Sequence, residues 1–242
     1  MTYDVTTDTQ RAYRGIEELA ALTEHVARHA PVGGDQRAFL VGWGLLAAMQ
    51  RQALAVILLH RKGFGHEAAP NRRAMIEHLA QIRWLSEDGC VAVDSMNRAL
   101  QFSQQRLRDA ADAAGMQYDP SIADAVKATV IPAHPANQYN NFSPLLQRLN
   151  PVLWAMWRGE TQLAHPTLTA AQFFYDDRSE GTATLFSEPT RRDGTEDPAD
   201  RCPYIAFLLL WSAFDGFNRL LKGEPWKEDL QRIASDGGIE EL

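Results

Sequence analysis

The chain has 242 residues, of which 45% are hydrophobic and 23% are charged, and its formal net charge is −7 at pH 7. This composition is typical of a folded globular protein and excludes collagen-like, low-complexity and wholly disordered chains. Cys90 and Cys202 are the only cysteines, which excludes a disulfide framework and a zinc site built from cysteines alone. We therefore expect a single domain over residues 1–242 whose core folds without a disulfide or metal.

Neither an export signal nor a membrane span is predicted. The longest apolar run, residues 38–49, ends at a polar Gln-Arg-Gln sequence and is shorter than the roughly 20 residues that a spanning helix needs. The polar N-terminus contains no apolar segment of the kind found in signal peptides. We expect a soluble, cytoplasmic protein without a membrane partner.

Apolar residues recur at three- and four-residue spacing along most of the chain, which predicts helices. The 35–62 helix is apolar nearly all round, as is typical of a central helix with neighbours on several sides. Pro70 fits the first turn of the next helix, where its missing N–H costs nothing. In chain order, the helices predicted in the first half lie at residues 8–30, 35–62, 70–87, 91–114 and 121–130.

The second half is also predicted to be helical, with more interruptions. Residues 132–142 are rich in Pro and Asn and are expected to form an ordered loop. A helix at 143–157 follows, which Pro151 is expected to kink or divide. The dipeptide His165-Pro166 interrupts the chain again before a short helix at 167–175.

A long loop is predicted at 176–201, in which only residues 182–186 show a weak strand pattern. The last strong helix is expected at 203–221, followed by a short helix from Trp226 and a frayed tail at 235–242. The predicted fold class is therefore all-α, a single bundle of about seven or eight helices. Its centre is expected to contain the helices at 35–62, 70–87 and 203–221.

Arg73 and Glu77 form the first candidate polar site. They are four residues apart, so they share one face of the 70–87 helix with Gln81 and Trp84. If Trp84 packs in the core, this face is partly buried, and its charges need partners or a ligand because an unpaired buried charge costs ~3–5 kcal/mol. The alternative is an exposed ion pair worth at most ~0.5 kcal/mol.

His165 is the second candidate. Because Pro166 follows it, His165 is expected to leave the helical conformation and to lie at a helix break. There its imidazole can point inward and serve as acid, base or hydrogen-bond acceptor. A histidine that only bridges a helix junction is the alternative. Trp157 and neighbouring aromatic residues either line a pocket near His165 or belong to the core.

Two motifs carry a resemblance to a known family. The segment GFGHEAAPNRRAMIEHLAQIRWL contains Arg73-x3-Glu77, and Thr161-x3-His165-Pro166 follows later in the chain. In these motifs the chain resembles an uncharacterised bacterial all-helical domain-of-unknown-function family, whose members share an Arg-x3-Glu helix and a later Ser/Thr-x3-His-Pro/Ser motif. The resemblance covers about residues 37–175. It implies a helical fold and a common site of Arg73, Glu77 and His165, without implying a reaction.

A weaker resemblance is to HEPN domains, helical modules that include metal-independent ribonucleases with an Arg-x4–6-His motif. Arg73 and His78 fit this motif with four intervening residues, and Arg72 and His78 fit it with five. The resemblance implies that Arg73 holds the scissile phosphate while His78, or His165, transfers a proton. Ala74 departs from the Asn, Asp or His that often follows the arginine in active members.

Charge and spacing narrow the possible partners and cofactors. Residues 51–83 carry six Arg or Lys and two Glu, a basic segment that could receive one phosphate or an acidic partner. A di-iron bundle needs two Glu-x-x-His pairs, and none of the seven histidines follows a glutamate at that spacing. His25-x3-His29 lacks the glutamate of a His-Glu-x-x-His site. We expect no metal and no cofactor.

The sequence leaves two functional hypotheses open. In the first, the chain is a non-catalytic binding or regulatory domain for a small ligand or protein partner, with a buried Arg73–Glu77–His165 site that ties the bundle or anchors the ligand. In the second, it is a HEPN-like effector that cleaves or binds RNA, as a homodimer, with His78 beside Arg73. The candidate ligand-binding residues are Arg73, Glu77, Trp84, Trp157 and His165, and the candidate catalytic residues are Arg73, His78 and His165.

Overall fold

The computed structural model describes residues 5–24, 29–117, 119, 121, 124, 131–179, 182–190 and 197–239. Several sequence predictions fall wholly or partly outside the described residues: His25, most of the 121–130 helix, residues 180–181 and 191–196 of the long loop, and residues 240–242 of the tail. The described part contains nine α-helices, two short 3-10 helices and one two-stranded hairpin. The all-α prediction is confirmed, with more helices than expected because proline divides the second half into short pieces.

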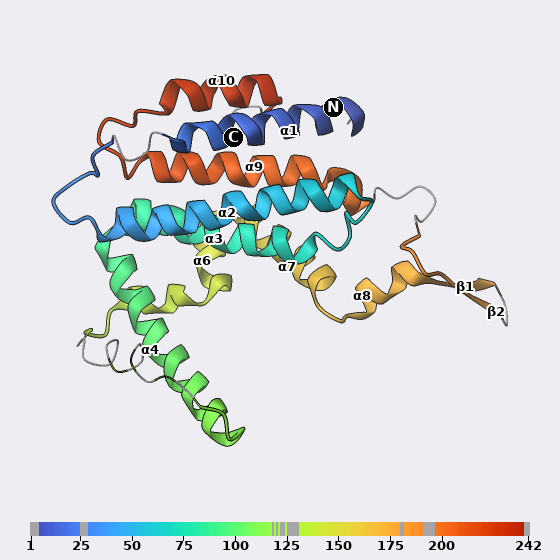
Figure 1. Ribbon diagram of the computed structural model, residues 1–242, viewed down its shortest axis with the longest axis horizontal. Helices are drawn as coiled ribbons and strands as arrows, with labels where there is room; N and C mark the ends of the chain where they lie inside the picture. Colours follow the sequence, from blue (N-terminus) through green and yellow to red (C-terminus); the bar gives the residue numbers. More distant parts are fainter. Residues whose placement is uncertain are drawn as a thin grey trace.

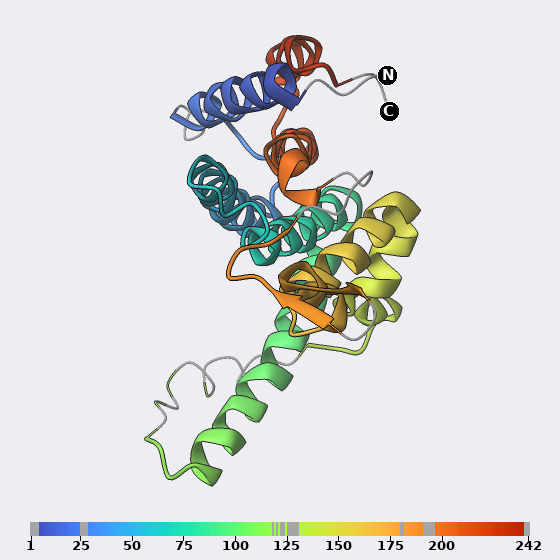
Figure 2. The ribbon, with the colours of Figure 1, turned by 90° about the vertical axis from the view of Figure 1, so that its right-hand side faces the viewer.

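Three long helices that pack against one another form the centre of the bundle: α2 (Arg37–Arg61), α3 (Ala69–Asp88) and α9 (Pro198–Asn218). On one side of α9 lie α1 (Val5–Leu22) and α10 (Lys227–Gly237), which form an outer layer (Figures 1 and 2). On the other side, α3 carries α6 (Phe142–Leu149) and α7 (Pro151–Ala164). The prediction of which helices occupy the centre is confirmed, and α3 lies between the α2–α9 pair and the α6–α7 pair.

Two parts project from this body (Figure 1). The first is the distal half of α4 (Cys90–Ala113), whose base contacts the 3-10 helix η2 (Pro135–Asn140). The second begins with α8 (Leu168–Ala171) and the 3-10 helix η3 (Gln172–Phe174) and ends in an antiparallel hairpin of β1 (Tyr175–Ser179) and β2 (Thr182–Leu185). The hairpin corrects the prediction of a loop from residue 176, and β2 coincides with the weak strand pattern.

Local chemistry explains the two breaks around α7. Asn150 caps the helix because its side chain accepts a hydrogen bond from the Val152 N–H, and Pro151 occupies the first turn. The helix ends at Ala164 because His165 is extended, with φ −108° and ψ 160°, ahead of Pro166. Both breaks are therefore where the proline positions predicted them.

Two boundaries near the C-terminus differ from the prediction. Helix α9 begins at Pro198 rather than at Pro203, because the Asp197 side chain caps it by accepting a hydrogen bond from the Ala199 N–H. Helix α10 continues to Gly237, which is buried, and ends at Gly238 in the left-handed conformation with φ 73°. Residues 235–237 are thus helical and not part of a frayed tail.

Helix α2 has neighbours on several sides, as predicted, but they do not surround it. Leu40, Leu54 and Leu58 are 59%, 49% and 60% exposed, so one side of the helix faces away from α3 and α9. By length and composition α2 could cross a membrane, with a mean hydropathy of 1.3 over its most apolar window. A core helix of a soluble protein meets the same criterion. The soluble, cytoplasmic assignment remains a prediction.

Contact between α1, α9 and α10 depends on two glycines. A Cβ atom added to Gly15 would lie 2.2 Å from Cε2 of Phe207, and one added to Gly237 would lie 2.3 Å from Cε1 of the same ring. The ring is fully buried, so it cannot move aside without disturbing the core. The two glycines therefore let the helices close on Phe207.

We expect Gly15→Ala to lower the free energy of unfolding by about 1–3 kcal/mol, because the methyl group overpacks the site of Phe207. Gly44→Ala is the matched control, since Gly44 is exposed within α2 and an added Cβ meets nothing within 4 Å. That substitution should raise stability by up to about 1 kcal/mol through helix propensity. Urea denaturation measures both, and equal effects would contradict the packing account.

Candidate functional site

Four of the predicted site residues meet between α3 and the C-terminal half of α7. Nη1 of Arg73 lies 2.5 Å from Nε2 of His165, and Nε of Arg73 lies 3.2 Å from Oε1 of Glu77. Nε1 of Trp157 donates a hydrogen bond of 2.9 Å to the same Glu77 oxygen, and the Arg73 guanidinium lies 5.8 Å from the centre of the Trp157 ring. We call these four residues the α3–α7 cluster.

The chemistry of the α3–α7 cluster follows from its donors and acceptors. A guanidinium only donates, so Nε2 of His165 has to accept from Arg73 with its lone pair, and the ring hydrogen then resides on Nδ1. The carboxylate of Glu77 balances the charge of Arg73 and accepts from Trp157. Arg73 and Glu77 on α3 are thus paired with each other, and each also contacts a ring at α7, Arg73 that of His165 and Glu77 that of Trp157. These contacts join the two helices.

The α3–α7 cluster is not buried, which corrects the expectation of a buried polar site. The side chains of Arg73 and Glu77 are 27% and 22% exposed, and His165 is exposed. The cluster lies where α7 ends and the chain turns toward α8, and the surface there is open because the break at His165-Pro166 carries the chain away from α3. The contacts themselves match the predicted grouping.

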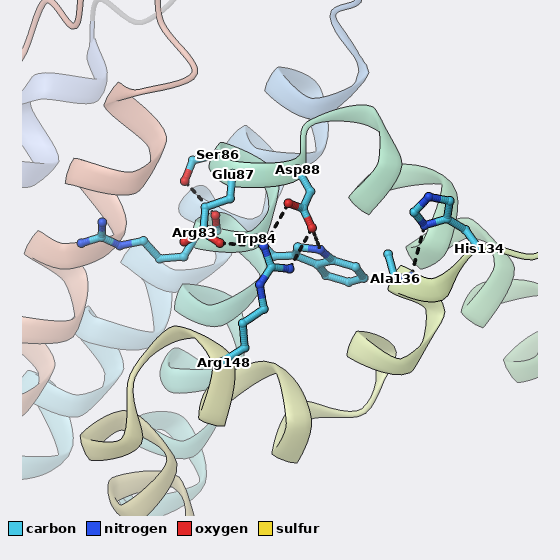
Figure 3. Close-up of polar contacts among 8 residues, drawn as sticks. All are labelled: Arg83, Trp84, Ser86, Glu87, Asp88, His134, Ala136 and Arg148. Carbon is cyan, nitrogen blue, oxygen red and sulfur yellow. Dashed lines mark hydrogen bonds and ion pairs between the residues drawn. The ribbon is translucent and has the colours of Figure 1, made fainter.

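His78 and Trp84 do not take part in the α3–α7 cluster. Nδ1 of His78 lies 2.6 Å from the carbonyl oxygen of Ala74, to which it donates within its own helix. Trp84 is 1% exposed, and its indole N–H donates to Asp88 over 2.9 Å (Figure 3). Trp84 therefore packs in the core, three helical turns from Arg73, where it is not placed to contact a ligand held by that arginine.

The deepest charge in this region belongs to Arg72, which sequence analysis assigned to no buried site. Arg72 is fully buried, and its Nε donates to Oε1 of Glu160 over 2.8 Å. Its Nη1 donates to the carbonyl oxygen of Gly65 over 2.9 Å. Within the described part of the chain, Nη2 of Arg72 and Oε2 of Glu160 have no hydrogen-bond partner. This ion pair joins α3 to α7 beneath the α3–α7 cluster.

The surroundings of Arg72 contain a buried thiol. Burial raises the pKa of Cys202 to about 11, against the opposing effect of the Arg72 guanidinium. Because only the thiolate is a nucleophile, this raised pKa disfavours reaction of Cys202 at neutral pH. The cysteine therefore serves as packing beside the ion pair.

A second ion pair ties the start of α9 to the loop before α3. Nε2 of His66 lies 2.9 Å from Oδ1 of Asp197, and both side chains are largely buried. The His66 ring also contacts Phe173, with 4.4 Å between ring centres. Because Asp197 also caps α9, the pair fixes the point at which the chain re-enters the bundle after the hairpin.

A sequence signal for the buried pair exists. Arg72 lies four residues before Ile76 and seven before Leu79, so it occupies the apolar face of its helix. Glu160 likewise follows Met156 and Trp157 at four- and three-residue spacing. A basic and an acidic residue, each on the apolar face of a different predicted helix, indicate a buried pair.

The basic segment at 51–83 does not form one exposed patch. Arg72 is buried, Arg83 pairs with Asp215 over 3.0 Å, and the Arg61 guanidinium lies 4.4 Å from the centre of the Tyr13 ring. These groups face different neighbours.

Arg148 of α6 holds the C-terminal end of α3 (Figure 3). Its Nη1 donates to Oδ2 of Asp88 over 2.8 Å, and its Nη2 donates to Oδ1 of Asp88 and to Oε2 of Glu87, each over 3.0 Å. These hydrogen bonds, with that from Trp84, hold the pKa of Asp88 below its ordinary value. The fork fixes α6 on α3.

Known proteins supply no assignment for this site. No protein-family model, no curated protein and no solved structure matches the chain. Among the described residues, no group of three or more His, Cys, Asp or Glu is arranged to hold a metal ion. The family resemblances therefore remain predictions.

Removing one partner of the buried pair should be more harmful than removing both. We expect Glu160→Leu to lower the free energy of unfolding by ~3–5 kcal/mol, because it leaves the Arg72 guanidinium buried and unpaired. The double variant Arg72→Met, Glu160→Leu should recover most of that loss. Thermal and urea unfolding measure this cycle, and additive losses would show that the two charges are not coupled.

The Asp88 site predicts a dependence of stability on pH. Its carboxyl has a lower pKa in the folded protein than in the unfolded chain, so its contribution is present above about pH 4 and is lost as pH falls through the folded pKa. Asp88→Asn should therefore flatten the acid side of the stability profile. In an Arg148→Met background the same substitution should have a smaller effect, because only the hydrogen bond from Trp84 then lowers the pKa of Asp88, and an equal effect in both backgrounds would exclude Arg148 as the main cause.

Proposed function

We propose that this protein is a non-catalytic binding or regulatory domain in which the α3–α7 cluster ties two helices together and thereby shapes a binding surface. The observation that carries the proposal is the mutual pairing of Arg73 with His165 and Glu77, and of Glu77 with Trp157. Arg73 has a hydrogen-bonding partner on the other side of the contact in His165 and a charge partner on its own helix in Glu77, although its Nε makes no hydrogen bond among the described residues. The predicted site residues Arg73, Glu77 and His165 are thus explained by the contact that they form between α3 and α7.

The same pairing argues against a role for Arg73 in holding the phosphate of RNA. A phosphate at Arg73 would have to displace His165 and would lie close to the carboxylate of Glu77, which repels it. The second residue of the HEPN-like motif, His78, donates a hydrogen bond to the carbonyl oxygen of Ala74. In the HEPN-like alternative, the side chains of Arg73 and His78 would both have to leave these contacts in order to face the same phosphate.

The α3–α7 cluster and the buried pair fix α7 at three points. Trp157 lies at the middle of α7, Glu160 on its C-terminal half and His165 directly after its last residue, and each contacts a different side chain of α3. Before Trp157, α7 is connected to α6, where Nε1 of Trp154 donates a hydrogen bond to Oγ of Ser143, and its contacts with α3 there are made by apolar side chains. A ligand or partner surface is therefore expected toward the N-terminal half.

The test is RNA cleavage by the purified protein in excess EDTA, with Arg73→Ala, His78→Ala and His165→Ala compared with wild type and each checked by thermal melt. We expect all four proteins to leave RNA intact. Arg73→Ala and His165→Ala should each lower the free energy of unfolding by about 1 kcal/mol, or about 2–4 °C in Tm, because a partly exposed contact is lost.

His78→Ala is the matched control, since its described hydrogen bond stays within one helix turn. Its melting temperature should differ less from wild type than that of Arg73→Ala. Cleavage that persists in EDTA and disappears in the folded His78→Ala protein would overturn the proposal and establish the RNA-cleaving alternative.

A further inference from the structure

A cleft of about 320 Å³ lies between α3, the junction of α6 with α7, and α9. Aliphatic side chains from all these elements form most of its walls, among them Leu79, Leu153, Met156 and Leu208. The polar groups at the cleft include Arg83 and Glu87 of α3 and Ser212 of α9. Concave sites with apolar walls and a few polar groups are typical of small-molecule binding, and this volume is at the small end of the usual range.

Polar connections at both ends hold this cleft open. At one end, Glu160 pairs with the buried Arg72 and fixes the C-terminal half of α7 on α3. At the other end, Arg148 forks onto Glu87 and Asp88 and fixes α6 on α3 (Figure 3). The cleft-lining residues between Leu149 and Met156 lie between these two connections in the sequence, so the segment that contains the α6–α7 junction is fixed on α3 at both ends.

The position of Arg83 depends on a close helix contact. A Cβ atom added to Gly216 of α9 would lie 3.2 Å from Cδ of Arg83, so the glycine leaves room for the arginine stem. The Arg83 side chain is 25% exposed, and Figure 3 shows it directed away from the Arg148 guanidinium. The guanidinium is therefore held at the cleft, with its stem packed against α9.

Arg83 is the cationic group among the residues that line the cleft. Oδ2 of Asp215 forms an ion pair with Nη1 of Arg83 over 3.0 Å and with Nη2 of Arg219 over 2.9 Å, so two guanidiniums share one carboxylate. Glu87, the acidic group on the cleft wall, is engaged by Arg148 over 3.0 Å. A guanidinium has five N–H donors, and a carboxylate suits their geometry.

We propose that this cleft binds an amphipathic carboxylate, with its aliphatic chain against the leucines of α3, α7 and α9 and its carboxylate on Arg83. This inference rests on the proposed binding function and names the chemical class of its ligand. The aliphatic walls supply affinity for the chain through burial of apolar surface. Arg83 and the Ser212 hydroxyl orient the head group.

The test uses sodium decanoate as the probe and isothermal titration calorimetry of the full chain. We expect saturable binding with one decanoate per chain. Arg83→Met should weaken it by about tenfold or more, since a charge-assisted hydrogen bond is lost while the apolar stem is kept. Arg83→Lys, which keeps the positive charge, should retain more of the affinity. Asp215 keeps Arg219 as a partner in both variants, so both are expected to fold.

Two further variants locate the probe. Leu208→Trp places a larger side chain on the cleft wall and should abolish binding, whereas Leu58→Trp, at an exposed position of α2, is the matched control and should leave it unchanged. Equal binding of decyltrimethylammonium would overturn the assignment of an anionic head group.

Absence of saturable decanoate binding, or binding that none of the cleft variants alters, would overturn the proposed site. These outcomes are distinguishable from failure of the proposed function. RNA cleavage that depends on His78 would reject the binding function whatever the titrations show. Intact RNA without decanoate binding would reject only the ligand.

Discussion

A charged side chain without contact to solvent has to be neutralised inside the protein, and Arg72 imposes this constraint on the whole bundle. Its partner, Glu160, lies 88 residues further along the chain, so the fold has to bring α7 onto α3. The pair leaves one nitrogen and one oxygen without hydrogen bonds among the described residues, which limits its net contribution to stability. Its effect is to specify where α7 lies.

Once Glu160 is fixed, the other contacts of α7 follow from helix geometry. Trp157 lies three residues earlier on the same helix and therefore reaches Glu77, which lies five residues beyond Arg72 on α3. The helix ends before Pro166, and the extended His165 then meets Arg73. One buried pair and one proline thus assemble the α3–α7 cluster, whose exposed position makes it a connection between helices at the surface of the bundle.

Helix α7 lines the cleft with its N-terminal half and is fixed on α3 from its middle to its C-terminal end. Polar contacts fix its C-terminal half, while the Arg148 fork fixes α6 beyond its N-terminal end. Apolar side chains between these points face α3 and α9 without closing the gap. A polar connection at each end of an apolar wall is a physical means of keeping a small cleft open in a bundle that otherwise closes around its core.

Local chemistry allowed the sequence to determine the helices, the breaks at Pro151 and His165, and the common face of Arg73 and Glu77, because each depends on residues within one or two turns. The tertiary structure decided how the charge of Arg72 is neutralised. The sequence places Arg72 on the apolar face of its helix, but its partner Glu160 lies 88 residues away, and only the packing of α7 on α3 brings the two together. The tertiary structure also decided that one side of α2 stays exposed and that Arg148 of α6 pairs with Asp88, because burial and long-range pairing depend on neighbours that are distant in sequence.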